Sequence, residues 1–263
     1  MAIVDDEHPI NEAAHTNDLH LSQTPNTTIA THFPPIGSDY DFVEPQNWPA
    51  DIVYLKYNVF EGSQPFPVSH QSSSYNSKCG CDYHRCIPAN TTRLTSRCVN
   101  AGMDLICDAT TCSGGQTCGN RFQQCFVLDL IATKVGFGVV CNTTIPNGSF
   151  VIEYVGEVLL RDAALNRYDR RYQVELKVKT TWGKRVALFI DARNGGNESR
   201  FINHCCEPNC ALYEYQWTNT VRLGIFATSD IPPLQELTFR YREENISLFE
   251  CQCSRTSCVS QLE

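Results

Sequence analysis

The sequence predicts a mainly β protein, in which small twisted sheets are flanked by metal-binding, cysteine-rich modules. Two observations lead to this prediction. Between Phe126 and Tyr241, short apolar runs alternate with Gly, Pro and Asn turns, a pattern typical of short strands. Most of the 15 cysteines fall in two clusters on either side of this stretch. The 263 residues suit one compact domain with appendages.

The start of the chain differs from the rest in composition. Residues 1–39 mix polar, acidic and proline residues without apolar periodicity, which predicts a disordered or loosely packed arm. Residues 40–78 should form an extended segment and linker whose aromatic side chains pack on a neighbouring surface. These side chains are Tyr40, Phe42, Trp48, Tyr54, Tyr57 and Phe60.

The first cysteine cluster, in residues 79–125, has a spacing that indicates metal ligation. Structural zinc takes four thiolates, and two sites can share one sulfur, so seven cysteines satisfy two zinc ions. Large apolar residues are few here, so metal would replace the missing core. The sequence leaves open which cysteine is shared. The predicted ligands are Cys79, Cys81, Cys86, Cys98, Cys107, Cys112 and Cys118.

The second cluster, in residues 244–263, supplies only three sulfurs, from Cys251, Cys253 and Cys258. A tetrahedral site needs a fourth ligand, and Cys206 is the candidate. We therefore expect three zinc ions in all. We expect Cys141 and Cys210 to be small apolar core residues. Cys125 and Cys205 are the first candidates to replace a predicted ligand if the assignment is off by one.

A secreted, disulfide-rich protein is the alternative interpretation of the same spacing. Six glycosylation sequons support it, at Asn26, Asn90, Asn142, Asn147, Asn197 and Asn245. The acidic, polar first residues lack the basic start and apolar core of a signal peptide, and the odd number of cysteines also favours zinc. No stretch reaches the roughly 18 apolar residues of a membrane span, so no membrane association is expected.

The central stretch, residues 126–243, divides into strands and one helix. Gly138–Cys141 and Phe150–Val155 should form a hairpin-like pair across the Pro146-Asn147-Gly148 turn. The same order of strand, turn and strand is predicted a second time, for Leu223–Ala227 and Glu236–Tyr241. In it, Asp230-Ile231-Pro232 matches Thr144-Ile145-Pro146, a match that common turn chemistry would also explain. A short amphipathic helix and two further strands are predicted at Leu160–Tyr168, Tyr172–Leu176 and Val186–Ile190.

The formal net charge of −8 bears on the choice of partner. An acidic surface repels nucleic acid phosphates and attracts cationic proteins, so no sequence-specific nucleic acid binding is expected. Solubility alone would explain the charge equally well.

Three blocks in the central stretch are unusually polar: Gly136–Gly138, Glu153–Glu157 and Arg200–Cys210. A Gly-x-Gly pair lets the backbone approach a ligand closely, although alone it usually marks a turn. Asn203 and His204 lie beside the predicted zinc ligand Cys206, which would fix their backbone. The alternative for His204 is a hydrogen-bonded core histidine.

These motifs, taken in order, resemble a SET-domain protein lysine methyltransferase with a post-SET zinc module. They comprise Gly136–Gly138, Glu153-Tyr154-x-Gly156-Glu157, Arg200–Cys210, Glu236–Tyr241 and the terminal Cys-x-Cys-x4-Cys. The preceding cluster resembles the AWS module, which binds two zinc ions through seven cysteines. The resemblance extends from Cys79 to Cys258, about two thirds of the chain. The chain resembles the histone H3 lysine 36 methyltransferases in particular because AWS-containing relatives mostly modify that lysine.

The resemblance implies a site with two entrances. S-adenosylmethionine should bind along Gly136, Phe137 and Gly138, with Tyr172, Asn203 and His204, in a fold where the last two residues thread through a pseudoknot. The target lysine should enter from the opposite face, through a channel lined by the catalytic residues Tyr154, Phe239 and Tyr241.

The chemistry needs alignment of a neutral amine with the sulfonium methyl group, and exclusion of water. A lysine of ordinary pKa near 10.4 is protonated at pH 7, and the sulfonium charge and an apolar channel both lower that pKa. Tyr241 should orient the amine. Phe239 stands where relatives carry Phe or Tyr, and Phe there predicts that di- or trimethylation is permitted.

The resemblance also implies a partner, which is the histone H3 tail or a nucleosome, with lysine 36 as the favoured target. It implies a location in nuclear chromatin, and we expect the protein to be a monomer. Lysine 4, lysine 9 or a non-histone protein would fit the acidic surface as well. A catalytically silent, zinc-stabilised interaction module is the alternative from another class. Two residues depart from the family pattern, Arg240 in place of Asp and Cys205 in place of Ser.

Overall fold

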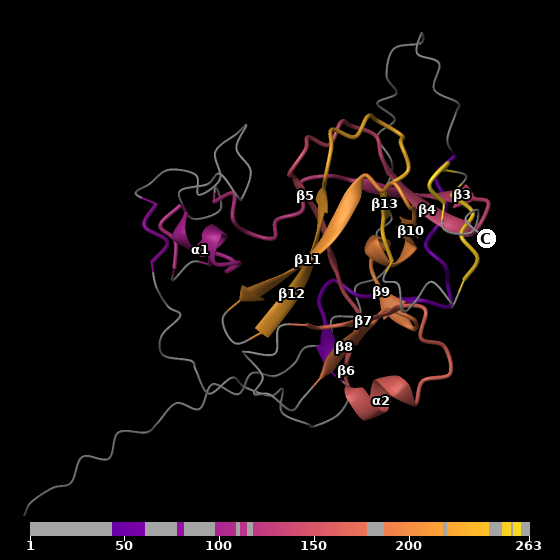
Figure 1. Ribbon diagram of the computed structural model, residues 1–263, viewed down its shortest axis with the longest axis horizontal. Helices are drawn as coiled ribbons and strands as arrows, with labels where there is room; N and C mark the ends of the chain where they lie inside the picture. The colour runs from indigo at the N-terminus through magenta and orange to yellow at the C-terminus, as the bar shows by residue number, and fades with distance from the viewer. Residues whose placement is uncertain are drawn as a thin grey trace, which may run out of the picture. The chain divides into compact units, whose positions relative to one another are not determined.

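The computed structural model describes residues 44–60, 78–81, 98–108, 111–114, 118–177, 187–217, 220–241, 249–253 and 255–258. The predicted N-terminal arm and the predicted ligand Cys86 lie outside these residues. The described part is mostly β structure with few helices, as the sequence predicts (Figure 1).

The central sheet is antiparallel and has three strands in the order β11-β12-β5. Its members are β11 (Cys210–Trp217), β12 (Thr220–Ala227) and β5 (Phe150–Tyr154) (Figure 1). β-Branched residues such as Ile225 and Ile152 alternate along the strands and are almost completely buried. This sheet carries Tyr154 at the end of β5.

A four-stranded sheet follows the order β2-β6-β8-β7. Its strands are β2 (Val59–Phe60), β6 (Glu157–Leu160), β8 (Leu188–Asp191) and β7 (Gln173–Glu175). β2 belongs to the aromatic segment before the cysteine clusters, so that segment is part of the fold. The sheet places Tyr172 immediately before β7.

Three two-stranded pairs complete the architecture. β3 (Leu128–Thr133) pairs with β4 (Gly136–Cys141), β1 (Val53–Tyr54) pairs with β9 (Gly195–Gly196), and β10 (Asn203–His204) pairs with β13 (Thr238–Phe239). The last pair is parallel and joins two segments that are distant in the sequence. This is the contact that the predicted pseudoknot requires.

The helices are short. α1 (Val99–Gly102) lies in the first cysteine cluster, α2 (Arg161–Leu165) follows β6, and η3 (Glu198–Phe201) is a 3₁₀-helix before β10. No helix in the described residues is long and apolar enough to cross a membrane.

The predicted hairpin-like pairs are wrong. β4 pairs with β3, whereas β5 pairs with β12, and β13 pairs with β10 rather than β12. The turns are real, but each joins strands of different sheets. However, the two matching tripeptides contact each other: Ile145 and Ile231 form an antiparallel bridge with two backbone hydrogen bonds of 2.9 Å. The two tripeptides that match in the sequence are therefore paired with each other in the structure.

The predicted helix is shorter than expected. α2 ends at Leu165 and buries Ala164, but Leu160 and Tyr168 are exposed at 43% and 101%. Apolar side chains at helical spacing did not form one buried face, because the chain leaves the helix after one turn.

In the aromatic segment, Trp48 packs edge-on against Tyr54 and Phe201, with ring centroids 5.0 and 5.4 Å apart.

Candidate functional site

The two glycines of the Gly-x-Gly motif serve different purposes at the start of β4. Gly136 has φ = +114°, a conformation that L side chains rarely adopt. Gly138 has an ordinary φ, but a Cβ there would lie 2.5 Å from Thr133 Cγ2 and 2.8 Å from Glu236 Oε1. The motif thus allows a tight turn and a close approach of two segments.

Asn203 connects this motif to the β10–β13 pair. Its side-chain amide donates to the Phe137 carbonyl at 2.9 Å and to Glu236 Oε1 at 2.8 Å. Both partners come from segments far away in the sequence. Asn203 therefore fixes the distance between the Gly-x-Gly loop and the segment that ends in Tyr241.

His204 lies between Tyr241 and a cysteine cluster. Its Nδ1 accepts the Tyr241 backbone N–H at 2.9 Å, so the proton of the neutral ring is on Nε2, which is 3.4 Å from Cys206 Sγ. Burial, and secondarily the charge of Arg240, lower the pKa of His204. The predicted alternative, a hydrogen-bonded histidine, describes these bonds well, but the ring also lines a cavity.

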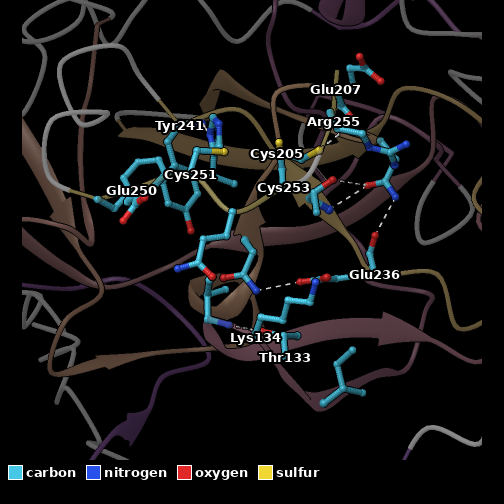
Figure 2. Close-up of a pocket in the computed structure, with 18 of the residues that line it drawn as sticks. Thr133, Lys134, Cys205, Glu207, Glu236, Tyr241, Glu250, Cys251, Cys253 and Arg255 are labelled. Carbon is cyan, nitrogen blue, oxygen red and sulfur yellow. Dashed lines mark hydrogen bonds between the residues drawn. The ribbon is translucent and has the colours of Figure 1, made fainter. Parts of the chain in front are cut away.

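That cavity has a volume of about 680 Å³ (Figure 2). Its size lies in the range of about 300–1,000 Å³ that is usual for small-molecule sites. Polar groups surround it on several sides, and Figure 2 shows Glu236, Lys134 and Arg255 among them. The predicted cofactor residues Tyr172, Asn203 and His204 line it.

A second cavity, of about 430 Å³, shares Tyr172, Asn203 and Tyr241 with the first. Gly136 and Phe137 line this one, together with Pro49 of the aromatic segment. The structure thus brings five of the six predicted cofactor residues to two adjoining cavities. Gly138 is the exception, because it lines neither and instead faces Thr133 and Glu236.

A narrow channel, of about 50 Å³, is lined by the three predicted catalytic residues Tyr154, Phe239 and Tyr241. The Tyr154 hydroxyl donates to the Tyr172 carbonyl at 2.8 Å, and the Tyr241 hydroxyl donates to the Ile202 carbonyl at 3.0 Å. Burial raises the pKa of both phenols above its ordinary value. Both phenols are therefore neutral, and the hydroxyl group of each is held by a hydrogen bond to a backbone carbonyl.

Tyr241, Tyr172 and Arg171 line all three spaces: the two cavities and the channel. The two larger cavities therefore meet the small channel at these residues. A molecule in the cavities and a side chain in the channel would meet at these residues. The arrangement suits a transfer between two substrates that enter by different routes.

Sequence reasoning missed an arginine pair beside the cavities. Asp169 is buried and forms ion pairs with both Arg171, at 2.8 Å, and Arg193. The hydrogen bonds from Arg171 lower the pKa of Asp169 to about 2. No motif marks these residues, and only the short Asp-x-Arg spacing could have indicated them.

Phe249 was also missed. Its ring lies 5.1 Å from that of His204 and 5.3 Å from that of Tyr241, between centroids. It immediately precedes the C-terminal cysteines, so it connects them to the site. An isolated aromatic residue before a cysteine cluster carries no recognisable signal.

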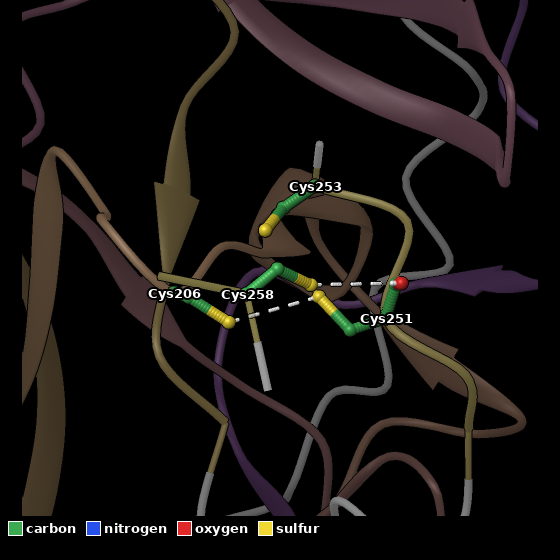
Figure 3. Close-up of side chains that lie close together, drawn as sticks. All are labelled: Cys206, Cys251, Cys253 and Cys258. Carbon is green, nitrogen blue, oxygen red and sulfur yellow. Dashed lines mark hydrogen bonds between the residues drawn. The ribbon is translucent and has the colours of Figure 1, made fainter. Parts of the chain in front are cut away.

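The C-terminal cluster consists of Cys206, Cys251, Cys253 and Cys258, whose sulfurs all lie within 4.8 Å of one another (Figure 3). The Cys206 and Cys251 sulfurs are 3.8 Å apart. Two thiolates on one tetrahedral zinc at Zn–S distances of about 2.3 Å would be separated by about 3.8 Å. These four residues therefore fit a zinc ion, and the fourth ligand predicted from the sequence is in place.

The N-terminal cluster consists of two groups of three sulfurs, and Cys107 belongs to both. Asn100 and Asn120 donate side-chain N–H groups to Cys107 Sγ at 3.4 and 3.2 Å, which favours a thiolate. Hydrogen bonds, the largest from Cys118, lower the pKa of Cys107. The groups are Cys79, Cys98 and Cys107, and Cys107, Cys112 and Cys118.

The other predicted ligand in this region, Cys81, packs against the N-terminal cluster and directs its thiol to the Cys79 carbonyl. None of the described cysteines forms a disulfide. Cys141 and Cys210 are core residues, as predicted, whereas Cys125 is exposed and Cys205 lines the larger cavity.

The fold and the site together define a class of protein. Residues 136–242 match the SET domain family, so the chain contains a SET domain. A relative from Mycosarcoma maydis, named a histone-lysine N-methyltransferase specific for H3 lysine 36, is 36% identical over 64% of this chain and 18% of its own length. A Homo sapiens relative with the same name is 33% identical over 69% of this chain and 7% of its own length.

A third relative is a putative histone-lysine N-methyltransferase of Arabidopsis thaliana. It is 30% identical over 80% of this chain, which covers 59% of that protein. The chain thus spans less than a fifth of the length of the first two relatives and about three fifths of the third.

Proposed function

We propose that this chain is an S-adenosylmethionine-dependent histone-lysine N-methyltransferase whose target is histone H3, with lysine 36 favoured. One observation carries the proposal: Tyr172 and Tyr241 stand where two small-molecule cavities meet a narrow aromatic channel. The substrate is proposed from the names of the relatives, which specify H3 lysine 36. The acidic chain would attract a basic histone tail. A nuclear location on chromatin follows from that substrate.

The cofactor proposal assigns the cavities to S-adenosylmethionine. Gly136 and Phe137 would present backbone to it, Asn203 and His204 would border it, and Tyr172 would separate it from the channel. Gly138 would act indirectly, by allowing the loop to approach Glu236. When bound, S-adenosylmethionine supplies a sulfonium methyl group for transfer.

The channel residues would prepare the lysine amine. Tyr154 and Phe239 are buried, so they exclude water and replace the hydration of the side chain with apolar contacts. An apolar surrounding lowers the pKa of an amine, so the neutral, nucleophilic form is favoured. Tyr241 would orient the amine. Because burial raises its pKa, the phenol stays protonated and has no free site for the amine proton, so water would carry that proton away.

The degree of methylation depends on space at the end of the channel. Phe239 lacks the hydroxyl with which a tyrosine would hold a water molecule there. Its ring lies 5.0 Å from that of Tyr241, between centroids. We therefore propose that di- and trimethylated products are permitted.

The zinc proposal comprises three ions. One would be held by the C-terminal cluster, as a post-SET module, and two by the first cluster, as an AWS module, with Cys107 the best placed of its described cysteines to be shared. We propose that these modules occupy residues 244–263 and 79–125, on either side of a catalytic domain at 126–243, and that the chain acts as a monomer.

The test is incubation with labelled S-adenosylmethionine and nucleosomes that carry single lysine-to-arginine changes in the H3 tail. We expect label on H3 that is lost when lysine 36 is changed and retained when lysine 4 or lysine 9 is changed. Mass spectrometry of the product then counts the methyl groups. Absence of label on every nucleosome, together with absence of S-adenosylmethionine binding, would overturn the proposed activity.

A further inference from the structure

A groove of about 520 Å³ lies directly beside the narrow channel. Val174, Leu212 and Arg240 line both the channel and the groove. If a target lysine occupies the channel, as the proposed function requires, residues next to that lysine in the substrate must lie in the groove. The side chains of the groove therefore contact the sequence around the target.

The groove contains three charged residues, Lys177, Glu214 and Arg240. The only acid, Glu214, accepts the Lys177 backbone N–H at 2.7 Å through Oε1. Its carboxylate keeps its negative charge, so the groove carries one negative and two positive side chains. The two cations are exposed, so they are accessible to a substrate.

Arg240 has unused hydrogen-bonding capacity. One of its N–H groups donates to the Cys206 carbonyl at 2.5 Å, and a guanidinium has five N–H groups in all. Across the described residues, no carboxylate forms an ion pair with Arg240 or with Lys177. The groove therefore presents a net positive charge beside the channel, and neither cation is held in an ion pair.

This local charge is opposite to that of the whole chain, which carries a formal net charge of −8. The overall charge attracts a basic protein over long distances, whereas the groove acts only on the residues that contact it.

We propose that Arg240 and Lys177 make this protein select a target lysine that has an aspartate or glutamate close to it in the substrate sequence. Arg240 is then a specificity-determining residue, and its bond to the Cys206 carbonyl holds its guanidinium at the groove. The inference rests on the proposed methyltransferase function. It adds a determinant that the relatives' names do not state.

The experiment compares methylation of peptides that differ in one charge. The parent is a histone H3 peptide centred on lysine 36, and each flanking position in turn is changed to Glu or to the isosteric Gln. We expect Glu to raise kcat/KM about two- to fivefold over Gln at one or more positions, the size of a solvent-exposed ion pair. The preference should shrink as the salt concentration is raised.

Variants assign the preference to the groove. In Arg240→Gln combined with Lys177→Gln the Glu/Gln ratio should fall to about one, and in Arg240→Asp it should fall below one. Arg161→Gln is the matched control, because it removes the same charge from an exposed residue of α2. Its ratio should equal that of the wild type. Because the readout is a ratio within one variant, a general loss of activity does not change it.

Two measurements separate the possible failures. Zinc content and S-adenosylmethionine binding of the Arg240 variants should match those of the wild type, which shows that the bond to Cys206 is not needed for folding. If the wild type shows equal kcat/KM for Glu and Gln at every position, or if the double variant keeps the preference, this inference is overturned while the proposed activity stands. If no peptide or nucleosome is methylated and no cofactor binds, the proposed function itself fails.

Discussion

The β core and the cysteine clusters are stabilised in different ways. In the core, the side chains of Ile145, Ile190 and Ile225 are 0% exposed, and burial of apolar surface contributes about 25 cal/mol per Å². In the clusters, the buried hydrophobic residues that pack together are cysteines, with Ala101 the exception. Sulfurs grouped in this way fit metal ligation. The comparison teaches that burial of apolar surface stabilises the core, whereas the clusters would depend on the proposed zinc ions.

The candidate site draws on both regions. Tyr154 and Phe239 belong to the β core, whereas His204 and Phe249 contact or adjoin the C-terminal cluster. The channel should therefore depend on core packing and the larger cavity on metal. Variants that damage one region without the other can test this division.

Zinc removal should have the largest effect. Structural zinc contributes about 10 kcal/mol or more to the folding of small zinc modules, so a strong chelator should unfold both clusters. We expect loss of cofactor binding and new protease cleavage in residues 98–118 and 249–258. The strands of the β core should stay protected. Limited proteolysis with mass spectrometry measures both.

Single cysteine variants sharpen this test. Cys258→Ser should lose one of three zinc ions by elemental analysis, because Cys258 is one of four clustered sulfurs. Cys125→Ser is the control, since Cys125 is exposed and belongs to neither cluster. Full zinc content in Cys258→Ser would contradict the ligand assignment.

A cavity in the core should give the complementary result. Ile225→Ala should lower the free energy of unfolding by about 2–5 kcal/mol, as expected for a fully buried side chain. Zinc content should not change, because Ile225 packs within the β core and belongs to neither cysteine cluster. Val127→Ala is the control, and its 67% exposure predicts a change within about 0.5 kcal/mol. Denaturant unfolding measures both, and zinc loss in Ile225→Ala would show that the regions are coupled.

The cysteine clusters and the β core also differ in how well the sequence predicts them. Cysteine spacing restricts ligand geometry strongly, so Cys206 could be assigned to a cluster some 45 residues away in the sequence, as the contact with Cys251 bears out. Strand pairing depends on partners that no local pattern names. The turn at Asn147 is real, yet β4 and β5 join different sheets.

The same reason explains the elements that were missed. β11 (Cys210–Trp217) contains Glu214 and Gln216 among its aromatics, and its burial comes from pairing with β12. Arg171 and Arg193 meet at Asp169 only because β7 and β8 are neighbours. In the site, Tyr154, Phe239 and Tyr241 could be grouped from ordered motifs, whereas the charges of the groove required coordinates.

Tyr241→Phe should separate chemistry from stability. It removes one hydroxyl and its bond to the Ile202 carbonyl, and we expect methyl transfer to fall about a hundredfold or more. Zinc content and cofactor affinity should change little, because the ring still packs against Phe249 and His204. Single-turnover rates and calorimetric binding measure the two. Near-normal activity would mean that the ring alone serves the reaction.

The pH dependence should show the smallest change. Burial raises the pKa of Tyr241 above its ordinary value of about 10, so the neutral phenol persists to higher pH than in solution. The rate should therefore rise with pH as the substrate amine loses its proton, without a falling limb from Tyr241 ionisation below about pH 10. Tyr241→Phe should keep the same rising limb at a lower rate. If the increase in rate with pH is absent in Tyr241→Phe, the titrating group is the Tyr241 phenol and not the substrate amine. The proposed role of the channel in lowering the pKa of the amine would then be wrong.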